Sequence, residues 1–312
     1  MDHINKVGNV EQIAYTKRIE FTNGKASGVK AILCKNERLC FILLESMALD
    51  MFDLSYAGNN MSFISKNGLV SRNLANTHAY DFSKSFGGGF LYTCGLDNIG
   101  KVDVDKILHG SLSTIPAKIT KDQILIENDQ IVLEVQGSIC DSALFSKDLE
   151  VVRNYKIYAD KVILTDRIIN HGFSDQDIIV LYHFNIGYPM LDSCTRFRAN
   201  ISNTECRTAN CDLEKFSIMD VPIDNCIEEV FIHSIKEDIA IIELENTILK
   251  QKIQFTYDTK YLKYLMEWKS MQSRDYALGI EPATSHLDDK KYISLKNDQS
   301  IENKITIEFI TG

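Results

Sequence analysis

The sequence predicts an almost all-β protein, and three observations support this prediction. Apolar and polar residues alternate with a period of two, and short polar turns interrupt the alternation at close intervals. The alternating segments are rich in Ile, Val, Tyr and Thr, which suit a pleated, half-buried surface. Long helical patterns do not separate these segments, as they would in a parallel α/β sheet. The pattern therefore favours antiparallel hairpins that form a sandwich or a barrel.

The strongest alternation places three hairpins and a closing strand along the chain. The hairpins are expected at Ile124–Val135 with a turn at Asn128–Asp129, at Arg153–Ile169 with a turn at Ala159–Asp160, and at Ile239–Tyr257 with a turn at Glu245–Asn246. The closing strand is expected at Lys304–Ile310.

Two further segments are harder to place from their pattern. Tyr261, Leu265 and Trp268 recur at helical spacing, so periodicity favours a short helix over Tyr261–Trp268. The glycine run Gly87–Gly89 precedes a strand-like segment instead of opening a helix, which favours a tight bend or close backbone packing over a phosphate-binding loop.

Length and composition are those of a globular protein with a sizeable core. The chain has 312 residues, of which 45% are hydrophobic and 25% are charged. It contains four prolines, no Pro/Gly/Ser-rich linker and no short internal repeat. We therefore expect one β domain over residues 1–312.

The charge of the chain and its lack of targeting signals limit the classes of partner and the compartment that are expected. The formal net charge is −9 and no basic block is present, so nucleic acid is not an expected partner. The longest apolar candidate, Asp177–Ile186, is far shorter than the roughly 20 residues of a membrane-spanning helix, so no membrane partner is expected. Residues Met1–Lys6 lack the basic and apolar regions of a secretory signal, which favours the cytoplasm. The sequence is compatible with a homodimer.

Eight cysteines are present: Cys34, Cys40, Cys94, Cys140, Cys194, Cys206, Cys211 and Cys226. In a chain without an export signal, free thiols are the expected state. The two closest pairs have no histidines at metal-site spacing nearby, so no zinc site is expected.

Several motifs of common enzyme classes are absent from the sequence. It contains no Gly-x-x-x-x-Gly-Lys loop, no Gly-x-Ser-x-Gly elbow and no His-Glu-x-x-His helix. What remains is polar residues inside apolar segments, namely His109, His183 and Glu281. A buried imidazole or carboxylate is costly unless it is paired or faces a cleft. Each of the three also has a structural interpretation, as a turn residue, a hydrogen-bonded core histidine and a strand-end surface carboxylate.

Four strings in a fixed order resemble a known family. They are Cys94-Gly-Leu-Asp-Asn-Ile-Gly100, His109-Gly110, Leu181-Tyr-His-Phe-Asn-Ile-Gly-Tyr-Pro189, and Trp268-Lys269 followed by Gly279-Ile-Glu-Pro282. Together they resemble a bacterial mutarotase-like family of unknown function within the aldose 1-epimerase (galactose mutarotase-like) superfamily. The resemblance runs from about Asp50 to the C-terminus. It implies a β-supersandwich of large antiparallel sheets with few short helices, and it implies a strand or loop at Tyr261–Trp268.

The resemblance also implies an activity, the interconversion of sugar anomers. Glu281 would act as the base at the anomeric hydroxyl, and His183, as imidazolium, would protonate the ring oxygen. The two groups are expected on opposite sides of a bound sugar, with room for a pyranose ring between them. His109, Asp97, Asn98 and Lys269 are the expected sugar-hydroxyl ligands. No metal or redox cofactor is needed, and the partner is a small-molecule sugar.

Trp268 has two interpretations, stacking on a sugar face or packing in the core. The chain also departs from the family. Where relatives carry an early Arg-Gly-x-Asp string, this sequence has Met47-Ala-Leu-Asp50. Two rival functions therefore stay open. One is a non-catalytic sugar-binding or sensing protein, and the other is an isomerase or lyase of an unusual sugar acid.

Overall fold

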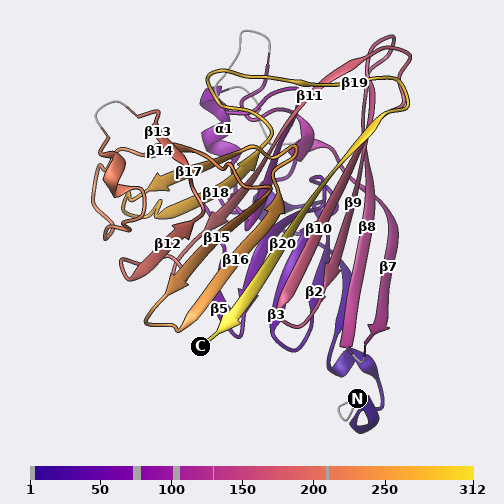
Figure 1. Cartoon of the computed structure of the whole chain (residues 1–312). Coiled ribbons are helices and arrows are strands. Elements are labelled where there is room, and N and C mark those ends of the chain that lie inside the picture. Colours follow the sequence, from indigo (N-terminus) through magenta and orange to yellow (C-terminus); the bar gives the residue numbers. More distant parts are fainter. Residues whose placement is uncertain (1–3, 73–78, 101–105, 129, 209–210) are drawn as a thin grey trace.

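Three antiparallel β-sheets make up most of the structure, a computed structural model that describes residues 4–72, 79–100, 106–128, 130–208 and 211–312 (Figure 1). The first sheet contains β1 (Tyr15–Glu20), β2 (Lys30–Lys35), β3 (Leu39–Leu44), β4 (Asp50–Tyr56) and β5 (Asn59–Asn60). The second has the order β12 (Thr195–Ala199), β15 (Ile239–Asn246), β16 (Gln251–Asp258), β20 (Ser300–Thr311), β10 (Lys161–Asn170), β9 (Asp148–Ile157), β8 (Gln130–Ser142) and β7 (Lys118–Glu127).

The third sheet carries the segments that resemble the family motifs. Its order is β13 (Asn203–Cys206), β14 (Glu229–Ser234), β17 (Tyr264–Ser270), β18 (Ala277–Ala283), β11 (Gln176–Ile186) and β19 (Ile293–Leu295), and β6 (Leu91–Leu96) also pairs with β11. The helical elements are η1 (Ile4–Lys6), η2 (Val10–Gln12), η3 (Gly24–Ala26), α1 (Ala79–Ser85), η4 (Leu112–Thr114) and η5 (Leu213–Lys215). The predicted supersandwich of large antiparallel sheets with few short helices is confirmed.

The three predicted hairpins and the closing strand are present. They correspond to β7–β8, β9–β10, β15–β16 and β20. The third turn was predicted two residues early, because β15 continues to Asn246 and the chain turns after it. Residue 129 of the first predicted turn lies outside the described residues.

The short helix predicted by periodicity at Tyr261–Trp268 is wrong. Residues Tyr264–Ser270 form β17, which pairs with β14 on one side and β18 on the other. An interior strand is covered on both faces, so apolar residues occur at odd and even positions and the period-two signal disappears. The family resemblance, which implied a strand or loop here, gave the better prediction.

Buried residues of all three sheets form one main core. Phe184 of β11 packs on Phe255 of β16, with their ring centroids 4.9 Å apart. Successive side chains of a strand point to opposite faces. Tyr182 and Phe184 of β11 therefore point into the core, while His183 between them points to the other face of the sheet.

A buried ionic network joins the three sheets. The Arg153 guanidinium, fully buried, donates two hydrogen bonds to the Asp166 carboxylate and one, of 2.7 Å, to Asp50. Asp50 also accepts from the backbone N–H and hydroxyl of Thr93, and Tyr182 donates its hydroxyl to Asp166. Asp50 belongs to the first sheet, Arg153 and Asp166 to the second, and Thr93 and Tyr182 to the third. Because each charge has an opposite partner, the network can exist in a dry interior.

The expectation that all eight cysteines are free thiols is wrong for one pair. Cys206 and Cys211 form a disulfide, and the other six are free. Their Cα atoms lie 6.4 Å apart, within the range that a disulfide spans.

The glycine run Gly87–Gly89 forms the tight, closely packed backbone that the sequence predicted. Gly88 and Gly89 have positive φ angles, and a Cβ atom on Gly88 would lie 2.5 Å from the carbonyl oxygen of Phe63.

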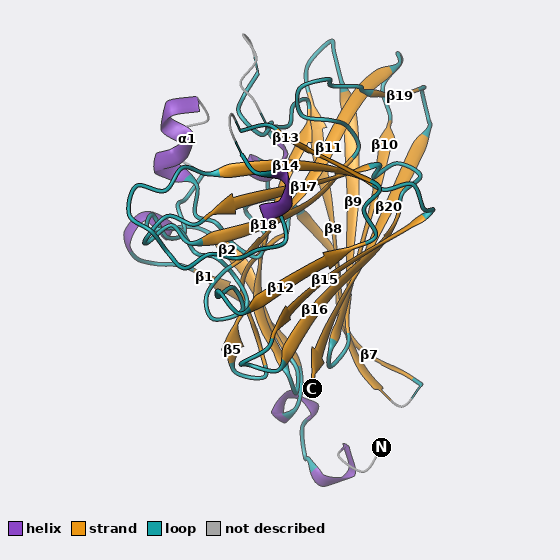
Figure 2. Ribbon diagram, turned by 60° about the vertical axis from the view of Figure 1, so that its left-hand side comes forward, coloured by secondary structure: helices purple, strands orange, loops and turns teal. Residues whose placement is uncertain are grey.

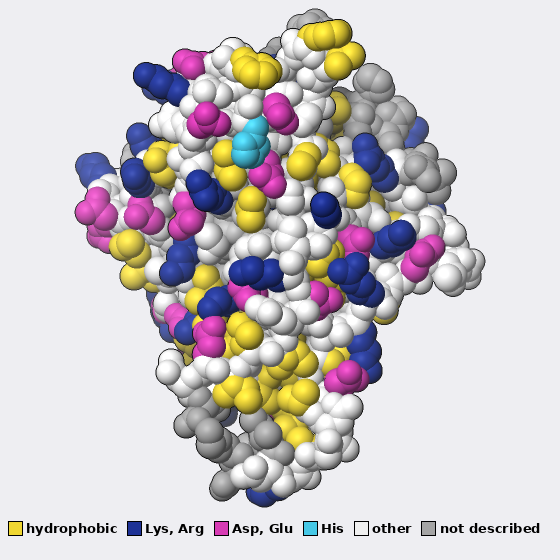
Figure 3. All heavy atoms as spheres, turned by 90° about the vertical axis from the view of Figure 1, so that its right-hand side faces the viewer, with side chains coloured by type: hydrophobic (Ala, Val, Ile, Leu, Met, Phe, Trp, Pro, Cys, Tyr) yellow, Lys and Arg dark blue, Asp and Glu magenta, His cyan; other side chains and the backbone are white. Residues whose placement is uncertain are grey.

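Helix α1 and the C-terminus lie at different ends of the molecule, and its surface carries mixed charges. Figure 2 shows α1 close to β14, β17 and β18 and far from the C-terminus. Figure 3 shows Lys and Arg side chains interspersed with Asp and Glu on the face that it displays, above a small apolar area. Among the described residues, no helix combines the length and the apolar character that crossing a membrane requires.

Candidate active site

A cavity of ≈ 840 Å³ lies on the face of the third sheet that points away from the core. This volume falls in the roughly 300–1,000 Å³ range of small-molecule sites. Its floor includes His183 of β11 and Glu281 of β18, and Trp268 of β17 lies beside them. The structure thus brings the two predicted catalytic residues to the same cavity from neighbouring strands.

His183 and Glu281 approach each other closely at the floor of this cavity. His183 Nε2 lies 3.0 Å from Glu281 Oε1, and the two residues are 7% and 4% exposed. Despite this short distance, Oε1 has no hydrogen-bond partner of good geometry, and His183 Nδ1 has none either. A buried polar atom without a partner is costly. Two such atoms at the floor of a cavity indicate a polar ligand.

Burial shifts both groups toward their neutral forms. The pKa of His183 falls to about 3, mainly because burial penalises the imidazolium and secondarily because His109 is close. The pKa of Glu281 rises to about 8, mainly through burial and secondarily through the charge of Glu228. Near neutral pH the pair therefore holds one proton, on Glu281 in the empty cavity. The family resemblance implied a carboxylate on Glu281 and an imidazolium on His183. In that state the pair also holds one proton, but the proton lies on His183 instead of Glu281.

The expected separation of His183 and Glu281 by a whole pyranose ring is wrong, since the two atoms are 3.0 Å apart. The expectation overlooked the geometry of the substrate. The anomeric oxygen and the ring oxygen of a pyranose are bonded to the same carbon and so lie next to each other. An acid and a base that serve these two oxygens must therefore be neighbours, as His183 and Glu281 are.

Gly279 makes this close approach sterically feasible. A Cβ atom at this position would lie 2.5 Å from Glu281 Oε1 and 3.1 Å from the His183 ring. The glycine thus leaves the space that both functional side chains occupy.

We expect Gly279→Ala to lower kcat/KM for anomer exchange by about 10²-fold, because a displacement of about 1 Å in a catalytic group has that effect. The added methyl group should lower the free energy of unfolding by only about 1–3 kcal/mol. Exchange kinetics and urea denaturation measure the two effects. Gly8→Ala is the control, since no atom lies within 4 Å of a Cβ atom there. Unchanged exchange in Gly279→Ala would show that the pair does not depend on this space.

His109 also reaches the cavity, with an unusual backbone conformation. Its φ angle is +65°, a left-handed conformation that non-glycine residues adopt rarely. The ring lies 5.9 Å from the His183 ring and 5.0 Å from Phe82 of α1, between ring centroids. The next residue, Gly110, also has a positive φ, and its Cα packs against the backbone of the Cys94–Gly100 segment.

Asp97 and Asn98 hold the His109 loop and do not line the cavity. Asp97 Oδ1 accepts from the backbone N–H of Ser111, and Asn98 Nδ2 donates to the carbonyl of Ile107. The backbone N–H of Gly95 donates to the carbonyl of His109 at 3.0 Å. Two of the four predicted sugar ligands therefore act on the loop that carries His109.

Lys269 is a second departure from the predicted set. It lies on the face of β17 opposite to Trp268, is 1% exposed, and donates its Nζ hydrogens to the carbonyls of Lys215 and Ile218. Adjacent residues of a strand point to opposite faces, so Trp268 and Lys269 cannot both reach the cavity. Lys269 instead anchors the segment around η5 to the sheet.

Besides Trp268, the cavity is lined by residues that the motifs did not indicate. Trp268 donates its indole N–H to Glu228 at 2.8 Å, and Arg207 donates to Asp288 at 3.1 Å. Glu228 and Arg207 both belong to irregular segments and both line the cavity. Phe63 and Phe86 add aromatic surface. Aromatic faces next to charged hydrogen-bonding groups match the apolar and polar sides of a sugar.

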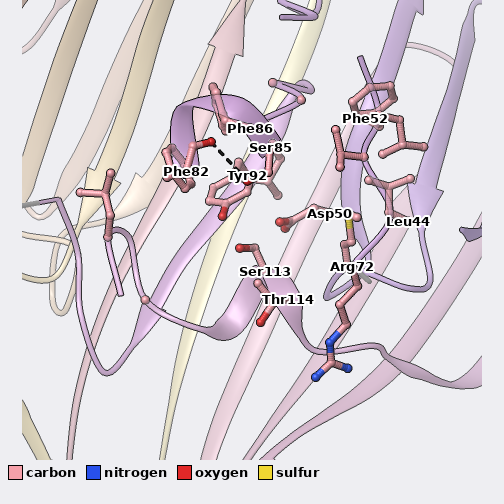
Figure 4. A pocket seen from close by; sticks show the side chains of 18 of the residues that line it. Leu44, Asp50, Phe52, Arg72, Phe82, Ser85, Phe86, Tyr92, Ser113 and Thr114 are labelled. Atoms are coloured by element: carbon pink, nitrogen blue, oxygen red, sulfur yellow. Dashed lines mark hydrogen bonds between the residues drawn. The ribbon is translucent and has the colours of Figure 1, made fainter. Parts of the chain in front are cut away.

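A smaller cavity of ≈ 60 Å³ lies on the other side of Phe82 and Phe86, which line both cavities. Figure 4 shows Asp50, Tyr92 and Ser113 directed toward its interior. Its volume is far below that of a typical ligand site. Met47, at the position of the family's early arginine, lines this smaller cavity. The departure from the family pattern therefore affects this region and not the floor formed by His183 and Glu281.

No ligand set for a metal is found in this region. Within the described part of the chain, no three His, Cys, Asp or Glu side chains are grouped so as to hold a metal ion.

The fold is that of the galactose mutarotase-like proteins. A Klebsiella pneumoniae protein provisionally named an aldose 1-epimerase superposes with a TM-score of 0.89 at 20% identity, covering 95% of this chain and 83% of its own. A galactose mutarotase-like protein from Clostridium acetobutylicum gives 0.73 at 15% identity, covering 96% and 100%. A protein from Salmonella typhimurium provisionally named a mutarotase gives 0.68 at 10% identity, covering 99% and 100%. At these identities the likeness concerns the fold.

Within this fold class, the chain belongs to the family described as a domain of unknown function, DUF4432, whose model matches residues 26–300. No curated protein matches the chain in sequence. The proteins with the same fold and the family of the chain therefore both agree with the resemblance seen in the motifs.

Proposed function

We propose that this protein is an aldose 1-epimerase that interconverts the two anomers of a sugar by acid–base catalysis at the His183–Glu281 pair. The observation that carries this proposal is the pair itself. An imidazole and a carboxyl group lie 3.0 Å apart, nearly buried, at the floor of a sugar-sized cavity, and each has a polar atom without an aligned partner. The mutarotase-like fold supports the choice of reaction class.

In the proposed reaction, Glu281 as carboxylate takes the proton of the anomeric hydroxyl, and His183 as imidazolium gives a proton to the ring oxygen. The bond between C1 and the ring oxygen breaks, and an open-chain aldehyde forms. Rotation about C1–C2 presents the other face of the aldehyde to the new hydroxyl group, and ring closure returns both protons. Each positioned proton transfer contributes about 10²–10⁴ in rate.

The single proton of the pair must lie on His183 before ring opening. In the empty cavity burial favours its position on Glu281. Transfer to His183 spans 3.0 Å and requires a small rotation that aligns the lone pair of Nε2 with the O–H of the Glu281 carboxyl group. A bound sugar supplies hydrogen bonds to both atoms, and such bonds favour the charged forms. His109, Trp268, Glu228 and Arg207 are proposed to bind the remaining sugar groups.

The rate of anomer exchange should depend on pH through this shared proton. Between pH values of about 3 and about 8 the pair holds one proton, and above about 8 it holds none. Without that proton the ring oxygen cannot be protonated, so kcat/KM, which reports the pKa values of the free protein, should fall as the pH rises through about 8. A polarimetric pH–rate profile measures this limb, with the spontaneous rate subtracted at each pH. A rate that continues to rise with pH beyond this point would contradict a proton-donating pair.

The identity of the sugar is a separate question, which a panel of freshly dissolved aldoses addresses. A non-catalytic sugar-binding protein would be stabilised against heat by a sugar without accelerating its anomer exchange. An accelerated return to anomeric equilibrium for at least one aldose supports the epimerase. Thermal stabilisation without any acceleration across the panel favours the binding protein.

A further inference from the structure

The Cys94–Gly100 motif holds the backbone of the His109 loop, and one of its side chains also touches the His109 ring. Cys94 Sγ lies 3.4 Å from His109 Nδ1. The cysteine is fully buried on β6, and its neighbour Gly95 binds the carbonyl of His109 through its backbone N–H. The His109 residue is therefore held at its backbone and at one ring nitrogen.

The environments of the two residues set the protonation states in which they meet. Burial raises the pKa of the Cys94 thiol well above its usual value, and the nearby carboxyl groups of Glu281 and Asp50 raise it further. Burial lowers the pKa of His109 to about 4, with smaller contributions from Arg207 and Lys290. Near neutral pH the cysteine is a thiol and the histidine is neutral. A thiol can donate or accept weakly, and a neutral imidazole has one donor and one acceptor nitrogen, so the two neutral groups can pair in either direction.

We propose that Cys94 is a positioning residue whose S–H group, donated to Nδ1, fixes His109 in the tautomer that carries its hydrogen on Nε2. The ring then offers a hydrogen-bond donor on the side opposite to Cys94. Since the ring lines the cavity, this donor serves an oxygen atom of the ligand. The tautomer itself is independent of the proposed epimerase activity. The use of the Nε2–H donor to bind a sugar, in contrast, rests on the proposed function.

The packing around the ring restricts the alternative, a flipped imidazole. Phe82 lies 5.0 Å from the ring centroid, Tyr92 lies at 6.4 Å with its plane at 75°, and His183 lies at 5.9 Å with its plane at 81°. These rings enclose His109 on several sides. Cys94 thus decides which ring nitrogen carries the hydrogen, and the aromatic rings keep the imidazole in place.

The test is the tautomer of His109, read by long-range proton–nitrogen correlation NMR on protein with nitrogen-15-labelled histidine. The His109 signals are assigned by their loss in His109→Gln. In the wild type at neutral pH we expect the hydrogen on Nε2. In Cys94→Ala the bias should disappear, and in Cys94→Ser, which keeps a donor, it should return at least in part. Cys34→Ala, which removes another fully buried thiol far from the cavity, should leave the tautomer unchanged.

Two outcomes would overturn the inference. One is a wild-type His109 that carries its hydrogen on Nδ1, a result that needs no variant to fold. The other is an unchanged Nε2–H tautomer in folded Cys94→Ala. A second measurement concerns binding. Cys94→Ala should raise KM for an accepted sugar about tenfold with little change in kcat, because one hydrogen bond made in both ground and transition states is lost. The predicted tautomer in a protein that exchanges no anomers would refute the proposed function and still support the role of Cys94.

Discussion

Glu281→Gln should lower kcat for anomer exchange by about 10²–10⁴-fold and leave sugar binding largely intact. The amide keeps the shape and one acceptor oxygen, but it can neither take the anomeric proton nor share a proton with His183. The loss should therefore appear in kcat, while the sugar-induced rise in melting temperature survives. Exchange kinetics and thermal denaturation with and without sugar measure the two effects.

A matched control lies on the neighbouring strand. Glu267 is fully buried like Glu281, and it also lies next to a histidine, with Oε2 3.1 Å from His233 Nε2. Its side chain points into the core and does not line the cavity, and burial raises its pKa above the usual value. Glu267→Gln should therefore keep anomer exchange. Equal losses in both variants would trace the effect to the removal of any buried carboxyl group and not to catalysis.

Arg153→Leu should lower the free energy of unfolding by about 3–5 kcal/mol, because it leaves the carboxylates of Asp50 and Asp166 buried without a counterion. Burial already raises the pKa of Asp50 to about 6 even with the arginine present. Without the arginine this pKa should rise further, since an opposite charge that favoured ionisation is gone. Urea denaturation at neutral pH measures the loss of stability.

Arg167→Leu is the control for this prediction. Arg167 belongs to the same strand as Asp166, but it is exposed and donates one hydrogen bond to Ser300. Surface substitutions of this kind usually change stability by no more than about 0.5 kcal/mol. If Arg153→Leu were as stable as the control, the network would not be a structural link between the three sheets.

The fold was predictable where strands have one face in the core and one in solvent. The hairpins at β7–β8, β9–β10 and β15–β16 belong to the second sheet, where alternation survives in the burial of successive residues. Alternation fails in β17 and β18, where residues on both faces are largely buried. One face packs on the core, and the other forms the floor of the cavity. There only the motifs indicated the strand, because periodicity carries no information when both faces are buried.

Only part of the candidate site was predictable from the sequence. His183 and Glu281 stand out because polar groups inside apolar strands need a partner or a cleft, and in the structure both line one cavity. Asp97, Asn98 and Lys269 have the chemistry of sugar ligands, but strand direction and loop contacts turn them away from the cavity. Arg207 and Glu228 were missed since charged residues in irregular segments are common. Only the folded chain brings them to the cavity.

The most direct test of the central claim is exchange NMR of the anomers of unmodified aldoses, with and without the protein, at neutral pH. The epimerase proposal predicts that the wild type accelerates exchange of at least one aldose above the spontaneous rate, and that Glu281→Gln abolishes the acceleration. If aldoses raise the melting temperature but none exchanges faster, or if Glu281→Gln exchanges anomers as fast as the wild type, the His183–Glu281 pair is not the catalyst proposed.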